Sequence, residues 1–375
     1  MREAKIEEWL TDSVDAPAAI VRREYLVPVE GEDGVLFPPT FAAAENSKVF
    51  AGGYNINDFD NGENICLIDS VGSQANRIEP IFASADFAAL VPQLVVEAGE
   101  KKINILEAGH RAGDAIVRCS ALKEPLRDAF LAMKRGDAVP LAKLAPTSLV
   151  FGVWDSRDTQ VKAPRLLTAT IRAYNVARLT RSAQYNPAIE YVEEGLLVST
   201  EDKDVLKAYS ERGYRHVPAT GTHGGVIARG GIRRDVTLQL AALRLLRGKN
   251  DEETAKLRAY LLGLALVAFT TPAIGYLRQG CNLVLSEDKS PETKIIYPDG
   301  QRKQYSITAK DALAFAESAA RAFGVGGSKT VPFDKQLAQN DVKSKEAKSK
   351  KGAAAKKAGG KDPSDQIEST EEVGE

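Results

Sequence analysis

Apolar and polar side chains alternate regularly along residues 165–176. One side of this stretch carries Leu167, Ala169, Ile171 and Ala173, and the other side carries Thr168, Thr170, Arg172 and Tyr174. A period of two residues predicts a β-strand that buries one face in the core. The outer face of the predicted strand is polar, basic and aromatic.

The same patterning predicts the rest of the fold. Expected strands cover residues 20–29, 65–71, 103–106, 114–119, 147–155, 282–285, 294–297 and 304–307. Expected helices cover residues 2–10, 84–99 with a break at Pro92, 125–136, 236–246, 253–269 and 308–323. The order strand, helix, strand, strand, helix, strand can be traced through these elements with long insertions. It is typical of an α+β fold with the RRM-like (ferredoxin-like) plan.

The domain organisation follows from where this patterning stops. Residues 1–330 are expected to form one folded core, in which residues 30–64 make a long inserted loop of the kind that is usually functional and residues 212–234 make a glycine- and arginine-rich loop. Residues 331–375 are expected to form a disordered charged tail. Within it, residues 343–361 hold eight lysines and one glutamate, and residues 362–375 hold six acids and no base. Such polar segments do not bury a core. The lysines either hold nucleic acid weakly or are neutralised by the acidic half.

Positive charge is concentrated in two segments, although the chain as a whole is nearly neutral. Lys+Arg number 50 and Asp+Glu 51, so no overall field steers the chain to a polyanion. Residues 157–181, however, carry six bases and one acid, and residues 212–234 carry five arginines, six glycines and no acid. Both segments suit a nucleic-acid backbone, and the first contains Tyr174, on which a base could stack. The alternatives are a solvated sheet face for the first segment and a mobile surface loop for the second.

A third candidate follows the buried strand at 65–71. Residues 72–77 combine a glycine, small polar side chains and one arginine, which suits a phosphate-binding turn. The same residues suit the start of a helix with Ser73 as its N-cap.

Familiar catalytic motifs are missing from the sequence. Residues 326–330 lack the glycine that precedes lysine in a P-loop, and no serine lies in a nucleophile elbow. The three histidines and three cysteines never fall at zinc-ligand spacing, and Asp58, Asp60 and Gly62 match a calcium loop poorly. We therefore expect no cofactor and no resident metal. The scattered cysteines, the acidic N-terminus and the short apolar run at 259–269 predict a soluble cytoplasmic protein without a membrane partner.

Four segments together resemble a known family: residues 68–80, 150–157, 164–173 and 230–234. They are similar to the backbone subunit of type I-U (also called I-G) CRISPR interference complexes, a Csb-type branch of the Cas-seven superfamily. The resemblance implies an RRM-like palm with inserted finger and thumb elements. It implies that many copies polymerise along one CRISPR guide RNA (crRNA) in a Cascade-type antiviral defence ribonucleoprotein. There they would join other subunits and present the guide for pairing with target DNA.

The resemblance also implies residue roles. Guide phosphates would be held by Ser73, Gln74, Asn76, Arg77, Arg157, Lys162 and Arg165. Residues 221–234 would form the thumb. Charge and position add four further RNA-binding candidates, namely Arg172, Arg229, Arg233 and Arg234.

The main hypothesis is therefore a non-catalytic RNA-binding filament subunit. Related RNA-targeting complexes cut RNA with a loop aspartate, so the rival is a metal-dependent RNase that uses Asp58 or Asp60. A third hypothesis is a stand-alone RNA chaperone, which would bind RNA without forming ordered multimers.

Overall fold

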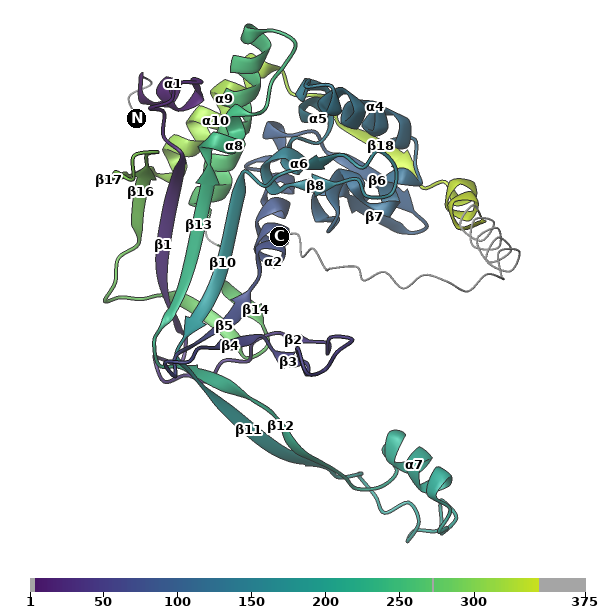
Figure 1. Cartoon of the computed structure of the whole chain (residues 1–375). Coiled ribbons are helices and arrows are strands. Elements are labelled where there is room, and N and C mark those ends of the chain that lie inside the picture. The colour runs from purple at the N-terminus through teal and green to yellow at the C-terminus, as the bar shows by residue number, and fades with distance from the viewer. Residues whose placement is uncertain (1–3, 272, 344–375) are drawn as a thin grey trace, which may run out of the picture.

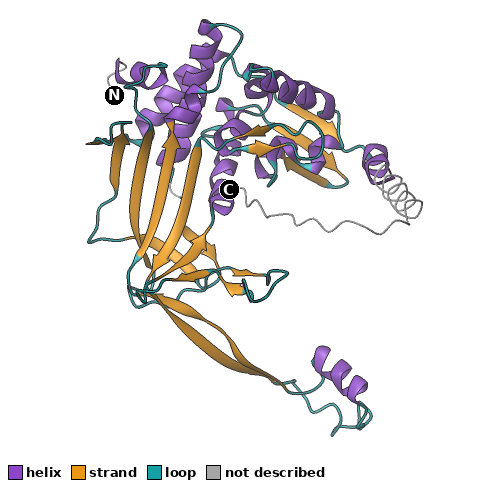
Figure 2. Ribbon diagram, in the orientation of Figure 1, coloured by secondary structure: helices purple, strands orange, loops and turns teal. Residues whose placement is uncertain are grey.

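The structure, a computed structural model, describes residues 4–271 and 273–343 (Figure 1). It is an α+β protein in which helices pack against a curled, mostly antiparallel sheet (Figure 2). A long two-stranded arm leaves one end of this sheet, and a helical lobe lies beside the other end (Figure 1).

Four strands form the palm. They are β1 (Ala19–Pro28), β10 (Leu167–Tyr174), β13 (Ile232–Gln239) and β16 (Glu292–Ile296). Their order across the sheet is β16-β1-β13-β10, and each neighbouring pair is antiparallel. The first and third strands along the chain therefore lie in the centre, and each of the two crossover connections skips one strand. This order confirms the expected RRM-like plan.

Other strands extend and curl this sheet. On the β10 side lie β5 (Asn64–Asp69) and β4 (Ile56–Asp58), and on the β1 side lie β15 (Cys281–Leu285), β14 (Gly275–Arg278) and β17 (Arg302–Gln304). The curl brings Cys66, Ile171, Ile232 and Leu283 into a small second core.

The main core lies between the sheet and its helices. The helices α9 (Asp251–Thr270) and α10 (Ala309–Phe323) pack so closely that a Cβ added at Gly263 would lie 2.7 Å from the Cα of Ala316. Thr308 and Asp311 have the sequence spacing of a capping box, which predicts a helix start here, and the Thr308 hydroxyl does accept from the Asp311 amide at 3.1 Å at the start of α10. Smaller helices α1 (Ala4–Leu10), α8 (Leu240–Arg244) and α2 (Val71–Ile78) complete this layer.

The helical lobe is inserted between the first and second palm strands. It contains α3 (Ala115–Arg118), α4 (Lys123–Lys134), α5 (Val139–Leu144) and α6 (Pro146–Phe151). A small sheet of β6 (Leu94–Ala98), β7 (Lys101–Asn104) and β18 (Lys329–Pro332) packs with them, as does the pair β8 (Val153–Trp154) and β9 (Lys162–Ala163).

The arm is inserted between the second and third palm strands. It pairs β11 (Val176–Tyr185) with β12 (Val217–Ala228), and the connection at its far end holds α7 (Lys203–Glu211). The expected loop at 30–64 is largely irregular but contains β2 (Thr40–Phe41), β3 (Gly53–Tyr54) and β4.

Several sequence-based expectations were wrong. Residues 147–155 are mostly the helix α6, whose six residues are all buried, so no polar face marked its helical period. Residues 84–99 form one short 3₁₀ turn (Ala88–Leu90) and β6 instead of one helix. Residues 103–106 begin in β7, which pairs with β6, and residues 115–118 are helical. Residues 236–239 continue β13 before α8 begins.

Two expected boundaries also move. The glycine and arginine stretch at 212–234 is not a loop, because it supplies all of β12 and the start of β13. Residues 331–333 belong to the folded part, because β18 pairs in parallel with β6 and the Phe333 amide donates to Glu97. Residues 335–343 are helical, and the rest of the expected tail lies outside the described residues.

Candidate nucleic-acid interface

One face of the palm turns away from both cores and carries the most suggestive side chains. Strand alternation places Tyr25, Arg172, Tyr174 and Arg233 on this open face. Arg233 lies centrally, since it is the register partner of Tyr25 on β1 and of Arg172 on β10. We call these four residues the basic-aromatic strip.

Contacts within the palm hold the strip in place. The Arg233 guanidinium lies 4.8 Å from the centroid of the Tyr174 ring, and its Nε donates to Asp235 at 2.8 Å. The Tyr25 hydroxyl donates to Glu292 at 3.0 Å. These contacts already restrict the rotation of the two tyrosine side chains. A base that stacks on either ring would therefore cost little further side-chain conformational entropy.

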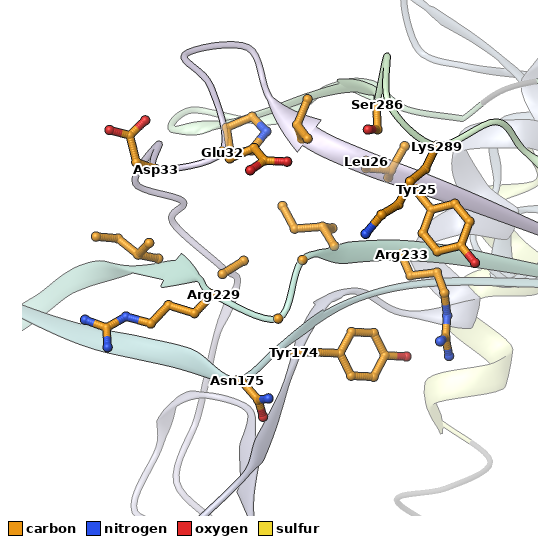
Figure 3. Close-up of a pocket in the computed structure, with 17 residues that line it drawn as sticks. Tyr25, Leu26, Glu32, Asp33, Tyr174, Asn175, Arg229, Arg233, Ser286 and Lys289 are labelled. Carbon is orange, nitrogen blue, oxygen red and sulfur yellow. The ribbon is translucent and has the colours of Figure 1, made fainter.

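The strip borders a hollow of about 720 Å³ where the arm leaves the palm (Figure 3). Tyr25, Tyr174 and Arg233 lie together there and Lys289 adds positive charge beside Tyr25, whereas the guanidinium of Arg229 points away from these residues (Figure 3). The lining also includes two acids, Glu32 and Asp33. A second hollow of about 300 Å³ shares Arg233 and is lined by Arg23, Lys294 and Arg302 among others. The hollowed surface therefore continues along the open face.

A buried polar network supports the palm from its other side. The carboxylate of Asp69, which is fully buried, accepts from Ser73 Oγ at 2.8 Å and from Gln74 Nε2 at 2.7 Å. It also pairs with Arg77 and Arg278, each at 3.1 Å. Residues 71–78 are helical, which confirms the helix interpretation of this segment. The N-cap is Ser70, one turn before the expected Ser73.

The network extends across the sheet through Arg234. Its Nη1 lies 2.6 Å from Glu24 Oε2, and its Nε donates to Gln74 at 2.8 Å. The side chains of Arg234 and Gln74 are both fully buried. These two predicted RNA-binding residues therefore face the protein interior, where their bonds to protein groups leave them out of contact with a solvent-side phosphate.

Other predicted residues form a second basic group, which we call the ledge. Arg157, Lys162 and Arg165 are all exposed on or beside the β8–β9 pair. The ammonium group of Lys162 lies 6.0 Å from the ring centroid of Trp154, whose side chain is also exposed. The ledge thus offers three cations and one aromatic face.

A buried ion pair lies behind the ledge. Asn76 accepts from Arg111 at 3.2 Å, so its amide oxygen is engaged within the protein. Arg111 pairs with Glu79 at 2.5 Å, and burial raises the pKa of the Glu79 carboxyl to about 7 although Arg111 opposes this shift. Although Arg165 is exposed as a residue, partial desolvation lowers the pKa of its guanidinium, and the positive charge of Arg111 adds to that lowering.

The predicted catalytic aspartates, Asp58 and Asp60, are exposed and do not lie in a buried ion-pair network. Asp58 lies on β4 and pairs with Arg178 of the arm at 2.6 Å, with both side chains about half exposed. Asp60 lies in the turn after β4. Among the described residues, no three histidine, cysteine, aspartate or glutamate side chains form a group that could hold a metal ion. The described cysteines are all buried.

The interface thus differs from the predicted residue set. It keeps Arg172, Arg229 and Arg233 on the open face and Arg157, Lys162 and Arg165 on the ledge, and leaves Arg77 and Ser73 partly buried around Asp69. Tyr25 and Lys289 were missed. Tyr25 had a usable signal, since it lies on the alternating face opposite Leu26 in a predicted strand.

Residues 20–178 match a family described as CRISPR-associated protein GSU0053 (Cas_GSU0053). The match runs from the first palm strand to the beginning of the arm, and supports a CRISPR-associated protein. A search of curated proteins finds no match to the chain. No helix in the described ranges is long and apolar enough to cross a bilayer.

Proposed function

We propose that this chain is a guide-RNA-binding backbone subunit of a cytoplasmic CRISPR interference complex. Copies of it multimerise along the crRNA, together with the other subunits of the complex, and present the guide for pairing with target DNA. The chain has a structural role in antiviral defence and performs no catalysis itself. The family match over the palm supports the CRISPR part of this proposal.

The observation that carries the RNA part is the basic-aromatic strip. RRM sheets bind single-stranded RNA by stacking bases on aromatic side chains of the open face, and Tyr25 and Tyr174 occupy such positions beside Arg172 and Arg233. Stacking on a ring accepts every base, because each base has a π-face. The protein can therefore hold guides of any sequence and leave recognition to base pairing.

The ledge supplies a second, purely electrostatic contact. Arg157, Lys162 and Arg165 are exposed cations on the helical side of the molecule. Cations of this kind bind phosphates without reading sequence. Two separate contact regions on one subunit suit a chain-like ligand that passes over several copies.

The test is RNA binding by purified protein across a series of salt concentrations. Arg233→Ala and Arg165→Ala should weaken binding to all single-stranded sequences alike, and each should lower the salt slope by about 0.7 per lost phosphate contact. Lys256→Ala is the matched control, because Lys256 lies on α9 and pairs with Glu252 at 2.6 Å. Loss confined to one sequence would contradict the proposal.

The rival function requires catalysis. A metal-dependent RNase would cleave RNA when Mg²⁺ or Mn²⁺ is added and would lose that cleavage in Asp58→Asn or Asp60→Asn. Intact RNA after incubation of the wild-type protein with either metal supports the structural role. Cleavage by the wild-type protein that disappears in one of these variants would favour the RNase function over the structural role.

A further inference from the structure

The described chain ends against the helical lobe. After the strand β18, the Asp334 amide donates to the Cys119 carbonyl at 2.7 Å, and residues 335–343 are helical. Leu337 and Asp341 of this helix line a hollow of about 370 Å³ on the lobe, which we call the groove. The part of the chain that follows residue 343 therefore starts beside the groove.

The groove and the ledge share Arg157, so we call the two together the lobe surface. Apart from the C-terminal helix, its acids are Glu124 and Asp158, and Asp158 pairs with Arg127 at 3.0 Å. Its cations are more numerous: Arg118, Lys123, Arg127, Arg157, Lys162 and Arg165. The lobe surface therefore carries an excess of positive charge and attracts anionic groups.

The sequence beyond Lys343 divides its charge between two parts. Residues 344–361 hold seven lysines and one glutamate, whereas residues 362–375, which we call the acidic segment, hold six acids and no base. A basic part is repelled by the lobe surface, and an acidic part is attracted to it. The acidic segment is therefore the part of the chain whose charge complements the lobe surface.

The acidic segment is tied close to this surface. Eighteen residues lie between Lys343 and Asp362, and at no more than about 3.6 Å per residue they span at most about 60 Å. Because this link begins at the groove, the acidic segment does not have to reach across the molecule. A tethered segment that can reach its site has an effective concentration on the order of millimolar, so even a weak contact is substantially occupied.

The lysines of residues 344–361 compete for the same carboxylates. A guanidinium group presents parallel N–H donors that match a carboxylate in a bidentate pair, whereas an ammonium group is a strongly hydrated point charge. The lobe surface contains four arginines, Arg157 and Arg165 among them, and residues 344–361 contain none. Carboxylates should therefore favour the lobe surface over the neighbouring lysines.

We propose that the acidic segment binds the lobe surface of its own chain when no RNA is present. Under the proposed function, RNA phosphates use Arg157, Lys162 and Arg165 of the same surface, so the acidic segment and RNA exclude each other. The contact is a property of the chain alone, whereas its effect on RNA rests on the proposed function. A tethered competitor with a millimolar to submillimolar dissociation constant weakens the apparent affinity for RNA about two- to tenfold.

This competition selects among nucleic acids. A short RNA that reaches only the lobe surface has to displace the acidic segment for a small number of phosphate contacts. A longer RNA that also contacts the basic-aromatic strip gains enough binding free energy to displace it. The acidic segment should therefore suppress loose binding of stray polyanions more than binding of a guide.

The first experiment detects the contact in RNA-free protein. A carbodiimide joins carboxylates to amines that touch them, and mass spectrometry identifies the joined peptides. The full chain at low salt should give cross-links from residues 362–375 to Lys162 or Lys123, which disappear when a single-stranded oligouridylate is added. Lys256 and Glu252, 2.6 Å apart on α9, are the internal control and should be joined with and without RNA. Cross-links from residues 362–375 only to the lysines of residues 343–361 would overturn the proposal.

The second experiment measures the competition. A variant in which all six carboxylates of the acidic segment become amides should bind a short oligouridylate about two- to tenfold more tightly than wild type at low salt. The same change should have no effect in a chain that also carries Arg157→Ala and Arg165→Ala. An equal gain in both backgrounds would reflect overall charge alone and would overturn the competition. The six changes are Asp362→Asn, Asp365→Asn, Glu368→Gln, Glu371→Gln, Glu372→Gln and Glu375→Gln.

The two proposals fail in different ways. If neither the wild-type chain nor the amide variant binds RNA, the guide-binding function fails, whereas the cross-links in RNA-free protein still decide the contact. If RNA binds but the cross-links to Lys162 and Lys123 do not form, the guide-binding function stands and the contact of the acidic segment is wrong.

Discussion

Arg233 lies with its guanidinium 4.8 Å from the ring centroid of Tyr174, across the boundary between the third and second palm strands. This pair defines the centre of the open face, because Tyr25 lies beside Arg233 on the other strand. A cation held over one face of a ring leaves the other ring surfaces for a base and places positive charge beside its phosphate.

Removal of the ring should therefore cost affinity for RNA. Tyr174→Ala is expected to weaken binding of single-stranded RNA by about 1–3 kcal/mol, the usual contribution of one base stacked on an aromatic side chain. Tyr174→Phe should keep most of the affinity, because it keeps the ring. Fluorescence anisotropy with a labelled oligonucleotide measures both. Tyr276→Ala, at an exposed tyrosine of β14, should bind as wild type does; equal losses in both alanine variants would argue against the strip.

Neighbouring arginines should differ sharply in their effect on stability. Arg234→Gln removes the fully buried partner of Glu24 at 2.6 Å and leaves only the partly buried Arg22 at 2.8 Å, so it should reduce the free energy of unfolding by about 3 kcal/mol. Arg233→Gln removes a partly exposed pair with Asp235 and the contact with the Tyr174 ring, and should cost about 1 kcal/mol. Urea unfolding followed by circular dichroism compares them. Equal losses of unfolding free energy in the two variants would contradict the burial of Arg234.

Glu79 gives the stability a pH dependence. Burial raises the pKa of its carboxyl from 4.5 to about 7, so between these values the folded protein binds more protons than the unfolded chain. This group therefore stabilises the fold most below pH 4.5, and its contribution is lost as the pH rises toward 7. Thermal unfolding between pH 5 and pH 7 should show a less negative slope in Glu79→Gln than in wild type.

The control for that experiment is Glu252→Gln. A hydrogen bond from Lys256 lowers the pKa of the exposed Glu252 carboxyl, so this group titrates below the chosen window. Its removal should leave the slope between pH 5 and pH 7 unchanged. A wild-type slope retained in Glu79→Gln would mean that another group causes it.

The joint between palm and arm is expected to depend on Asn64. Its side chain accepts from the Val176 amide at 2.7 Å and donates to the Val176 carbonyl at 3.1 Å. Asn64→Ala should lose about 1–3 kcal/mol locally, since each hydrogen bond contributes about 0.5–1.5 kcal/mol. Hydrogen exchange should accelerate in β11 and β12 and stay unchanged in α9. Faster exchange throughout the protein would indicate a global loss of stability instead.

Close packing of the two long helices gives a further prediction. A Cβ at Gly263 would lie 2.7 Å from the Cα of Ala316, which is backbone and cannot move aside cheaply. Gly263→Ala should therefore destabilise the fold by about 1–3 kcal/mol despite its better helix propensity. Gly72→Ala is the control, because a Cβ there meets nothing within 4 Å. Thermal unfolding of both variants checks the difference.

Local sequence patterns predicted the elements whose form does not depend on contacts with distant segments of the chain. The alternation at 167–174, the helix start at Thr308 and the apolar run in α9 each depend on neighbours in sequence, and all were confirmed. α6 was mistaken for a strand because it is buried on every side, and burial is decided by elements far away in the chain. β12 was mistaken for a loop because its glycines suggested flexibility, whereas Gly224 lies so close to Thr180 of β11 that a Cβ would meet its backbone at 2.6 Å.

The candidate interface was predictable to the same extent. Positive charge in the right segments identified Arg172 and Arg233, but it also selected Arg234, the next residue. Whether Arg233 or Arg234 faces solvent depends on recognising the strand Ile232–Gln239, whose apolar positions alternate with the phase that buries Arg234. Gln74 was taken for a phosphate ligand because its partners, Asp69 and Arg234, lie on two other elements. The local sequence around Gln74 gives no sign of hydrogen bonds with residues on two other elements.

The joint at the base of the arm has a geometric consequence. Asn175 and Gly231 have φ of 48° and 80°, and the Gly230 amide donates to Tyr174 at 2.8 Å, so the bend is fixed by backbone conformation and hydrogen bonds. A bend fixed in this way is the same in every copy. In a multimer of identical chains, every arm would therefore leave its own palm in the same direction, so these few residues would give the assembly a regular outline.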